Sequence, residues 1–168
     1  MPKQASLAIV GFMAAGKTTI GRSLAQQLRM PFFDADREIE TAFGLSVPEI
    51  FAERGESEFR TAERELISRL LSGPPKVLSL GGGAYVDVRT REAVNEVSTA
   101  IWLDPPFDLI LARLARSSKR PLASGKSSEE LRHLWNERRA SYADAHIHIV
   151  TSDANPSDAV RQILKALG

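Results

Sequence analysis

The segment Gly11-Phe-Met-Ala-Ala-Gly-Lys-Thr-Thr19 decides the fold. It fits the pattern Gly-x-x-x-x-Gly-Lys-Thr, and it stands between a short apolar run, 6–10, and a stretch with helical spacing, 17–29. Glycines let successive backbone N–H groups turn inward around an anion, and the start of a helix adds its positive dipole. In this pattern the lysine reaches the β- and γ-phosphates and the threonine after it binds Mg²⁺. The segment therefore predicts a phosphate-binding loop for a nucleoside triphosphate.

Length, charge and cysteine content limit the classes of protein to consider. The chain has 168 residues, a formal net charge of +1 and no cysteine. This length suffices for one domain with a substantial core, so we expect a single domain over 1–168. The low net charge argues against a general nucleic-acid binder, and the lack of cysteine excludes a disulfide scaffold and fits the cytoplasm. The apolar run 7–15 is at the short end for a signal peptide, and no segment approaches a membrane span.

Short apolar runs alternate with stretches of helical spacing along the chain. Strands are predicted at 6–10, 32–33, 77–80, 99–103 and 146–150, and helices at 17–29, 37–43, 47–53, 58–71 and 156–167. This alternation implies right-handed crossovers, and therefore an α/β fold with three layers, α/β/α, around a five-stranded parallel sheet.

Three predicted strands end in chemically unusual loops, at 11–18, 34–36 and 81–83. Because ligands of such sheets bind at the carboxyl ends of the strands, we expect the three loops to converge on one crevice. The guanine-reading stretch Asn-Lys-x-Asp of GTPase switch proteins is absent from the sequence. A kinase for a small molecule fits the length of the chain.

Seven segments, in order over nearly the whole chain, resemble the shikimate kinase family, which belongs to the nucleoside-monophosphate-kinase-like P-loop proteins. They are GRSLAQQL after the loop, FFDADREIE, IFAERGESEFRTAE, VLSLGGGA, KRPL, ERRASY and the pair Asn155-Pro156. The resemblance implies a P-loop kinase fold with a mobile lid at about 113–127 and a substrate-binding helical region at about 35–62. It also implies transfer of the γ-phosphoryl group of ATP to the 3-hydroxyl of shikimate, in aromatic amino-acid (chorismate) biosynthesis. We expect a monomer that has neither nucleic-acid nor membrane partners.

The resemblance assigns ATP and Mg²⁺ to the first loop and to segments around it. Lys17 and Arg120 would act on the transferred phosphoryl group, while Thr18 and Asp34 would hold Mg²⁺. Asp34 has an alternative role as the cap of the next helix. The residues assigned to the nucleotide are Gly11, Ala14, Ala15, Gly16, Lys17, Thr18, Thr19, Arg113, Arg120 and Pro156. Ala14 stands where the family usually has glycine.

The resemblance also assigns an acceptor site. Asp36 would bind the hydroxyl groups and accept a proton from the attacking one, and we expect it to stay ionised near Mg²⁺ and arginines. Arg60 and Arg138 would clamp the substrate carboxylate, since a guanidinium pairs with it through two hydrogen bonds. Backbone N–H groups of Gly81, Gly82 and Gly83 would approach the substrate.

Two of these assignments have alternatives in the sequence itself. Arg60 could instead form surface ion pairs with its helical neighbours Glu56 and Glu63. Arg139 competes with Arg138 for the place of the second clamp, because the two are adjacent. We choose Arg138, because it stands four residues before Tyr142, the spacing of the family.

The segment 109–128 has five basic residues and no acidic one. Together with its glycine and serines, this composition suits a lid that closes over ATP, the alternative being a solvated basic loop. We interpret His146 and His148 as structural, because a metal site needs further ligands and none is near in the sequence. Trp102 and Trp135 are predicted to pack in the core or between helices.

Two rival functions stay open at this point. A gluconate kinase, or another small-metabolite kinase of the same fold, would have a similar loop and lid, and gluconate also carries a carboxylate and hydroxyls. A nucleotide-binding regulatory domain without catalysis is the other rival, and Ala14 is the feature that favours it.

Overall fold

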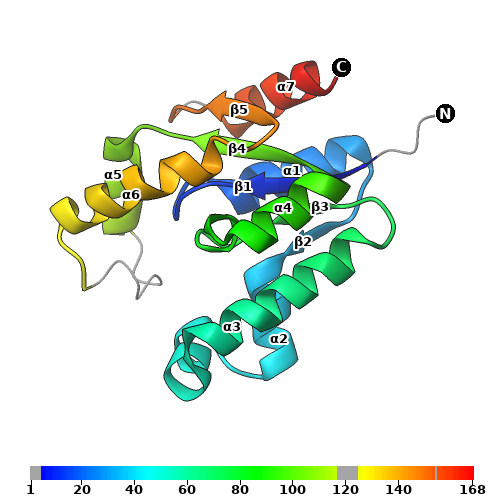
Figure 1. The fold of residues 1–168 in the computed structure, drawn as a ribbon. Coiled ribbons are helices and arrows are strands. Elements are labelled where there is room, and N and C mark those ends of the chain that lie inside the picture. Colours follow the sequence, from blue (N-terminus) through cyan, green and yellow to red (C-terminus); the bar gives the residue numbers. More distant parts are fainter. Residues whose placement is uncertain (1–4, 117–124, 154) are drawn as a thin grey trace.

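Five parallel strands form one sheet, in the order β2-β3-β1-β4-β5 (Figure 1). A computed structural model describes residues 5–116, 125–153 and 155–168. Strand β1 lies in the middle, where Leu7 stands opposite Val77 on one side and Thr99 on the other. The strands are β1 Ser6–Val10, β2 Phe32–Asp34, β3 Val77–Ser79, β4 Ser98–Asp104 and β5 Ile147–Val150.

Helices cover both faces of the sheet, as the alternation of strands and helices predicts. Helices α1 and α7 pack together on one face, and the second half of α3 with α4, α5 and α6 covers the other (Figure 1). The helices are α1 Lys17–Leu28, α2 Ala35–Phe43, α3 Val47–Leu71, α4 Val88–Val97, α5 Phe107–Arg116, α6 Ser128–Tyr142 and α7 Pro156–Leu167, with a short 3-10 turn η1 at Ala84–Val86. None of the helices in the described ranges is both long and apolar enough to span a membrane.

The sheet is buried on both faces, which explains why its strands read as continuous apolar runs. Leu24 of α1 and Val160 of α7 are fully buried together with Ile101 of β4. Burial of aliphatic side chains of this size contributes about 1.5–3 kcal/mol each. The sheet is therefore a rigid base, and the loops at the carboxyl ends of its strands are held in fixed positions.

Helix α2 and the first half of α3 extend away from the sheet, at the bottom of Figure 1. A separate small core of Ile39, Ile50, Phe59 and Leu66 joins them. Helix α3 is interrupted at Gly55, whose φ of 81° and ψ of 164° are not helical, so the two helices predicted at 47–53 and 58–71 meet there with a kink. This arrangement presents the first turns after the kink to the carboxyl ends of β1 and β3.

The sheet and the helices named in the sequence analysis are confirmed to within one or two residues at most ends. Helices α4, α5 and α6 were not predicted. The signal for α4 is Asp87, whose side chain accepts a hydrogen bond from the Thr90 amide over 2.9 Å and caps the helix. Residues 113–116 of the predicted lid are the last turn of α5, whereas 117–124, with Arg120, lie outside the described residues.

The backbone at Ala14 adopts a left-handed conformation with φ of 60°. This conformation costs an L-residue about 1–2 kcal/mol, while glycine adopts it freely. The alanine is therefore tolerated in the loop between β1 and α1 at the cost of local strain.

We predict that Ala14→Gly stabilises the protein. Relief of strain of about 1–2 kcal/mol exceeds the chain entropy of about 0.5–1 kcal/mol that glycine costs, so the free energy of unfolding should rise by about 0.5–1 kcal/mol. Urea denaturation of both proteins measures the difference.

Ala15→Gly is the matched control for this prediction. Ala15 is the next residue of the same loop, is buried and has no left-handed backbone. Its replacement should destabilise the protein, because glycine loses more conformational entropy on folding and because a buried methyl group is removed. If both variants lose the same stability, the strain at Ala14 plays no part.

Candidate active site

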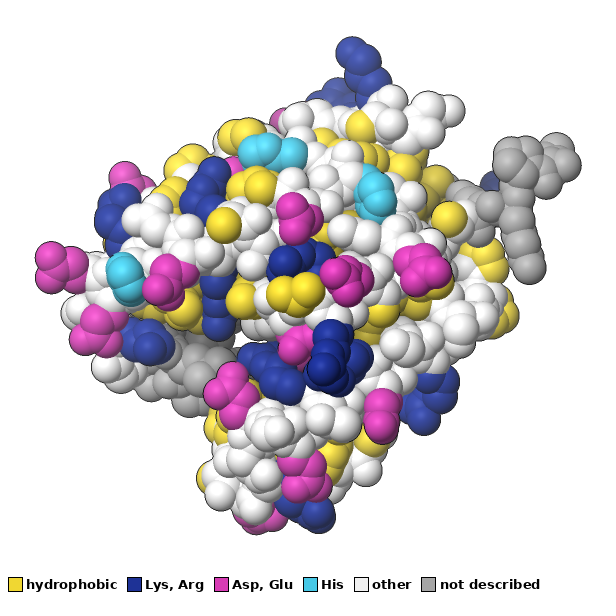
Figure 2. Space-filling view, in the orientation of Figure 1, with side chains coloured by type: hydrophobic (Ala, Val, Ile, Leu, Met, Phe, Trp, Pro, Cys, Tyr) yellow, Lys and Arg dark blue, Asp and Glu magenta, His cyan; other side chains and the backbone are white. Residues whose placement is uncertain are grey.

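A cavity of about 660 Å³ opens at the carboxyl ends of β1, β2 and β3. We call it the larger cavity. Its walls include Lys17 and Thr18 from the first loop, Asp36 from the second and residues 81–83 from the third. The predicted convergence of the three loops is thus confirmed. Figure 2 shows basic and acidic side chains gathered at the notch where the α2–α3 part meets the rest of the molecule.

A smaller cavity of about 340 Å³ lies on the other side of the first loop. Ala14, Gly16 and Thr19 form one wall, and Arg113 and Pro156 are also among the residues that line it. The first loop therefore separates two spaces that a nucleotide and a second molecule could occupy.

Lys17 folds back over the first loop. Its Nζ atom donates hydrogen bonds to the carbonyl oxygen atoms of Gly11, over 2.8 Å, and Phe12, over 2.9 Å. The loop is also held from α5, because Arg113 donates a hydrogen bond to the carbonyl oxygen of Ala14 over 2.9 Å. Both cations lie beside the loop that the sequence assigns to phosphates.

Thr18 and Asp34 lie side by side, as a shared role would require. The Thr18 hydroxyl donates a hydrogen bond to Oδ2 of Asp34 over 3.1 Å. The other carboxylate oxygen, Oδ1, accepts a hydrogen bond from the Arg37 amide and so caps α2. The two interpretations of Asp34 are compatible, since each uses a different oxygen atom. A hydroxyl and a carboxylate oxygen at this spacing suit a hard cation such as Mg²⁺.

Asp36 projects from the first turn of α2 into the larger cavity. Burial raises the pKa of its carboxyl above the ordinary value, and the charge of Asp34 adds to the rise. Lys17 and Arg60 lower the pKa by less. The expectation that nearby positive charges hold this carboxylate ionised is therefore incomplete, because desolvation acts in the opposite direction. A raised pKa makes the carboxylate a better proton acceptor.

Residues 81–83 form a wall without side chains, which we call the glycine wall. A Cβ atom at Gly81 would lie 2.6 Å from Oδ1 of Asp36, and one at Gly83 would overlap the guanidinium of Arg60. Any side chain here would displace these two charged groups. The glycines are therefore required by the close approach of their neighbours.

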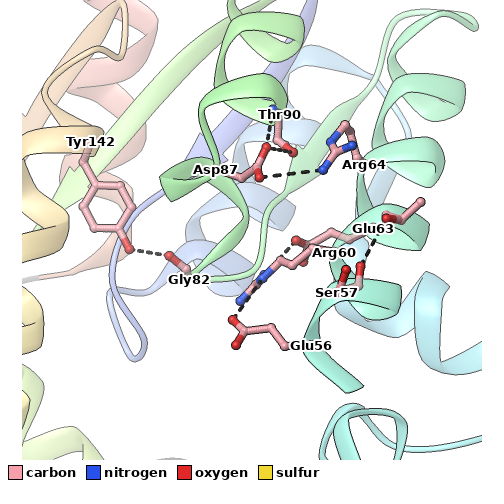
Figure 3. A network of polar contacts seen from close by, with 10 residues as sticks. Glu56, Ser57, Arg60, Glu63, Arg64, Gly82, Asp87, Thr90 and Tyr142 are labelled. Atoms are coloured by element: carbon pink, nitrogen blue, oxygen red, sulfur yellow. Dashed lines mark hydrogen bonds and ion pairs between the residues drawn. The ribbon is translucent and has the colours of Figure 1, made fainter. Parts of the chain in front are cut away.

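Arg138 reaches the same wall from α6. A Cβ atom at Gly82 would lie 3.2 Å from Nη1 of Arg138. One turn further along the helix, the Tyr142 hydroxyl donates a hydrogen bond of 2.5 Å to the carbonyl oxygen of Gly82 (Figure 3). Burial raises the pKa of Tyr142 to about 12, so this hydroxyl stays protonated and remains a donor.

The structure separates the two adjacent arginines of α6. Arg138 lines the larger cavity and lies over the Phe12 ring. Arg139 points elsewhere and pairs with Asp104, at 2.5 and 3.0 Å. Only Arg138 is thus placed to meet a ligand in the cavity.

Glu63 is a residue of the cavity that the sequence analysis named only as a helical neighbour of Arg60. Its side chain is 1% exposed. Its Oε1 atom lies 2.7 Å from Nη1 of Arg60, a contact drawn in Figure 3. Glu56 is more distant, at 3.7 Å from Nε, and exposed. Both ion pairs that were considered for Arg60 exist, yet its guanidinium still lines the cavity. The spacing of three residues between Arg60 and Glu63 was the available signal.

Burial also raises the pKa of Glu63 from 4.5 to about 7, although the Arg60 guanidinium opposes the rise. The uncharged form is therefore favoured in the folded protein more than in the unfolded chain.

The histidines and tryptophans serve packing roles, as expected. His146 accepts a hydrogen bond from the Ala100 amide over 2.9 Å, and His148 stacks on Trp102 with ring centres 4.0 Å apart. Trp135 packs against Phe107.

We predict that Glu63 makes stability depend on pH in a defined window. Because its pKa is higher in the folded state, its contribution is fully present below pH 4.5 and is lost as the pH rises through 7. The loss amounts to about 3 kcal/mol of unfolding free energy. Urea denaturation between pH 4.5 and 8 measures the free energy of unfolding. In Glu63→Gln this free energy should no longer fall with pH by that amount.

Glu56→Gln is the control, because Glu56 pairs with the same arginine but is 69% exposed. It should leave the pH dependence of wild type intact. An identical pH dependence in wild type and Glu63→Gln would contradict the assignment to Glu63.

Similarity to a rival kinase is limited to the fold. A gluconokinase from Sinorhizobium meliloti superimposes with a TM-score of 0.59 over 99% of this chain and 93% of its own, at 13% identity. At this identity, the likeness speaks only for a shared fold.

Similarity to shikimate kinases is much greater. The shikimate kinase of Caulobacter vibrioides is 45% identical over 163 residues, which cover 96% of this chain and 82% of that protein. The structure of shikimate kinase from Acinetobacter baumannii in complex with shikimate superimposes with a TM-score of 0.92 at 36% identity, covering 98% of this chain and 93% of that one. The family model of shikimate kinase matches residues 13–168. The match covers nearly the whole chain, including the phosphate-binding loop, the glycine wall and both arginines of the larger cavity. This chain therefore belongs to the shikimate kinase family.

Proposed function

We propose that this protein transfers the γ-phosphoryl group of ATP to the 3-hydroxyl of shikimate. The observation that carries the proposal is the convergence of Asp36, Arg60 and Arg138 on the glycine wall. Two guanidinium groups and one carboxylate suit an acceptor that has a carboxylate at one end and a hydroxyl at the other. The bound shikimate in the Acinetobacter baumannii structure supports this choice of acceptor.

In this proposal the nucleotide spans the first loop. The base occupies the smaller cavity between Arg113 and Pro156, and the phosphates follow the loop toward the larger cavity. Lys17 leaves the loop carbonyls to contact the β- and γ-phosphates, where its charge opposes the negative charge that develops during transfer.

Thr18 and Asp34 would hold Mg²⁺. An ion held there would supply positive charge near the β- and γ-phosphates. Asp34 keeps its cap on α2 through its other oxygen atom, so the metal-binding oxygen is held in place by the helix.

The oxygen of the acceptor hydroxyl attacks the γ-phosphorus, and Asp36 takes the proton of that hydroxyl. The bond from that phosphorus to the bridging oxygen of ADP breaks, and ADP leaves with the electron pair. Arg60 and Arg138 hold the carboxylate at the far end, so the hydroxyl is aligned before transfer. The glycine wall lets all three groups approach the same small molecule. The lack of cysteine fits a reducing compartment, so we place the enzyme in the cytoplasm, and we expect it to be a monomer.

A coupled assay of ADP release tests the proposal. Shikimate, gluconate and nucleoside monophosphates are compared as acceptors at matched ATP. We expect the highest kcat/KM for shikimate, because a rigid ring holds its carboxylate and hydroxyl at a fixed separation, whereas the open chain of gluconate must be ordered first.

The Arg138→Ala variant serves as the control for the site of binding. It should lower kcat/KM for shikimate while leaving the KM for ATP nearly unchanged. A tenfold preference for gluconate or for a nucleoside monophosphate would refute the proposed acceptor.

A further inference from the structure

Asp104 and Arg139 form a close ion pair, and neither residue lines the larger cavity. Asp104 is the last residue of β4, and its side chain is 8% exposed. The two carboxylate oxygen atoms accept hydrogen bonds from the two terminal nitrogens of Arg139, over 2.5 and 3.0 Å. The guanidinium lies between Trp102 and Trp135, 4.9 and 4.5 Å from their ring centres. Because it pairs with Asp104 and lies over two aromatic rings, this guanidinium has little freedom to move.

Asp104 itself is held from a second strand. Nε2 of His148, on β5, lies 2.8 Å from Oδ2 of Asp104. The same imidazole stacks on Trp102, which belongs to β4. The anchor for Arg139 is therefore part of the rigid sheet and not of a loose surface loop.

Helix α6 depends on such an anchor because it buries few apolar side chains. Of its fifteen residues only Leu131 and Tyr142 are buried. The hydrogen bond of Tyr142 to Gly82 holds the last turn against the glycine wall (Figure 3). In the middle of the helix, Leu134 and Trp135 are only partly buried against the core. The pair of Arg139 with Asp104 adds a polar anchor on the sheet directly beside Arg138.

Successive residues of a helix point about 100° apart, since one turn takes 3.6 residues. When Arg139 is fixed on the sheet, the direction of Arg138 is fixed with it. That direction leads into the larger cavity, toward Gly82.

We propose that Asp104 and Arg139 are positioning residues for the acceptor: their ion pair sets the rotation of α6 and so aims Arg138 at the acceptor carboxylate. The inference rests on the proposed function, because it takes Arg138 as a clamp for that carboxylate. The pair touches neither ATP nor acceptor and acts through Arg138 alone.

A double-mutant cycle tests this route of action. The proteins are wild type, Arg139→Lys, Arg138→Ala and the double variant, each assayed for KM of shikimate, KM of ATP and kcat. Lysine keeps the charge but cannot form the paired hydrogen bonds. Arg139→Lys alone should raise the KM for shikimate about tenfold, with kcat and the KM for ATP within about twofold of wild type. In the Arg138→Ala background it should have no further effect on the KM for shikimate.

Arg132→Lys is the matched control, because Arg132 is on the same helix, lies over the Phe107 ring and pairs with an aspartate, Asp108, at 3.8 Å. Its side chain is 52% exposed, and its pair is on the surface. This variant should behave as wild type.

Asp104→Asn removes the paired hydrogen bonds from the other side, since an amide nitrogen cannot accept a hydrogen bond from the guanidinium. It should reproduce the kinetics of Arg139→Lys.

Equal effects of Arg139→Lys with and without Arg138, or an equal rise in the KM for ATP, would overturn the inference. Failure of both Arg139→Lys and Asp104→Asn to fold, seen by circular dichroism, would also overturn it, because the pair would then serve the fold itself. If wild type does not phosphorylate shikimate, the proposed function fails instead, and the two failures are distinguishable.

Discussion

The site depends on the absence of side chains at one point, the glycine wall that follows β3. Asp36 arrives there from α2 and Arg60 from α3, and each lies so close to the wall that a Cβ atom on it would collide with the charged group. Arg138 arrives from α6 at the remaining glycine. Three helices that belong to different parts of the chain can thus bring charged groups to one small volume. The rigid sheet below and the small core between α2 and α3 keep their approaches fixed.

The charges of this volume are balanced but partly desolvated. Burial raises the pKa of Asp36 and of Glu63, and each lies near the positive charge of Arg60. Glu63 thus holds Arg60 by a short ion pair in a place where its own charge is costly. An acceptor carboxylate that enters the cavity offers the guanidinium a second anionic partner. The competition between the two carboxylates links the acidity of Glu63 to the binding of an acceptor.

Much of this arrangement could be predicted from sequence, because it rests on local patterns. The loop at 11–18 and the apolar runs predicted the parallel sheet, and the motifs at the ends of the strands indicated which loops would meet. The sequence favoured Arg138 over Arg139 only through its spacing to Tyr142, since adjacent basic residues look alike until Asp104 is seen beside one of them. The left-handed backbone of Ala14 and the raised pKa of Glu63 are likewise consequences of tertiary packing. Helix α6 was missed because it buries little and has no clear apolar stripe.

Binding of shikimate to Gly83→Ala, measured by calorimetry without nucleotide, tests most directly whether the glycine wall controls acceptor binding. The new methyl group would occupy the place of the Arg60 guanidinium, which is the far end of a flexible side chain and can give way without loss of the fold. We predict a Kd for shikimate at least about tenfold higher, with an unchanged affinity for ADP and a circular dichroism spectrum that shows the folded protein. Gly73→Ala, which precedes β3 at its other end and would bring the added atom 3.3 Å from Nζ of Lys76, should match the wild-type affinity for shikimate. A wild-type affinity for shikimate in Gly83→Ala would show that the glycine wall does not control acceptor binding.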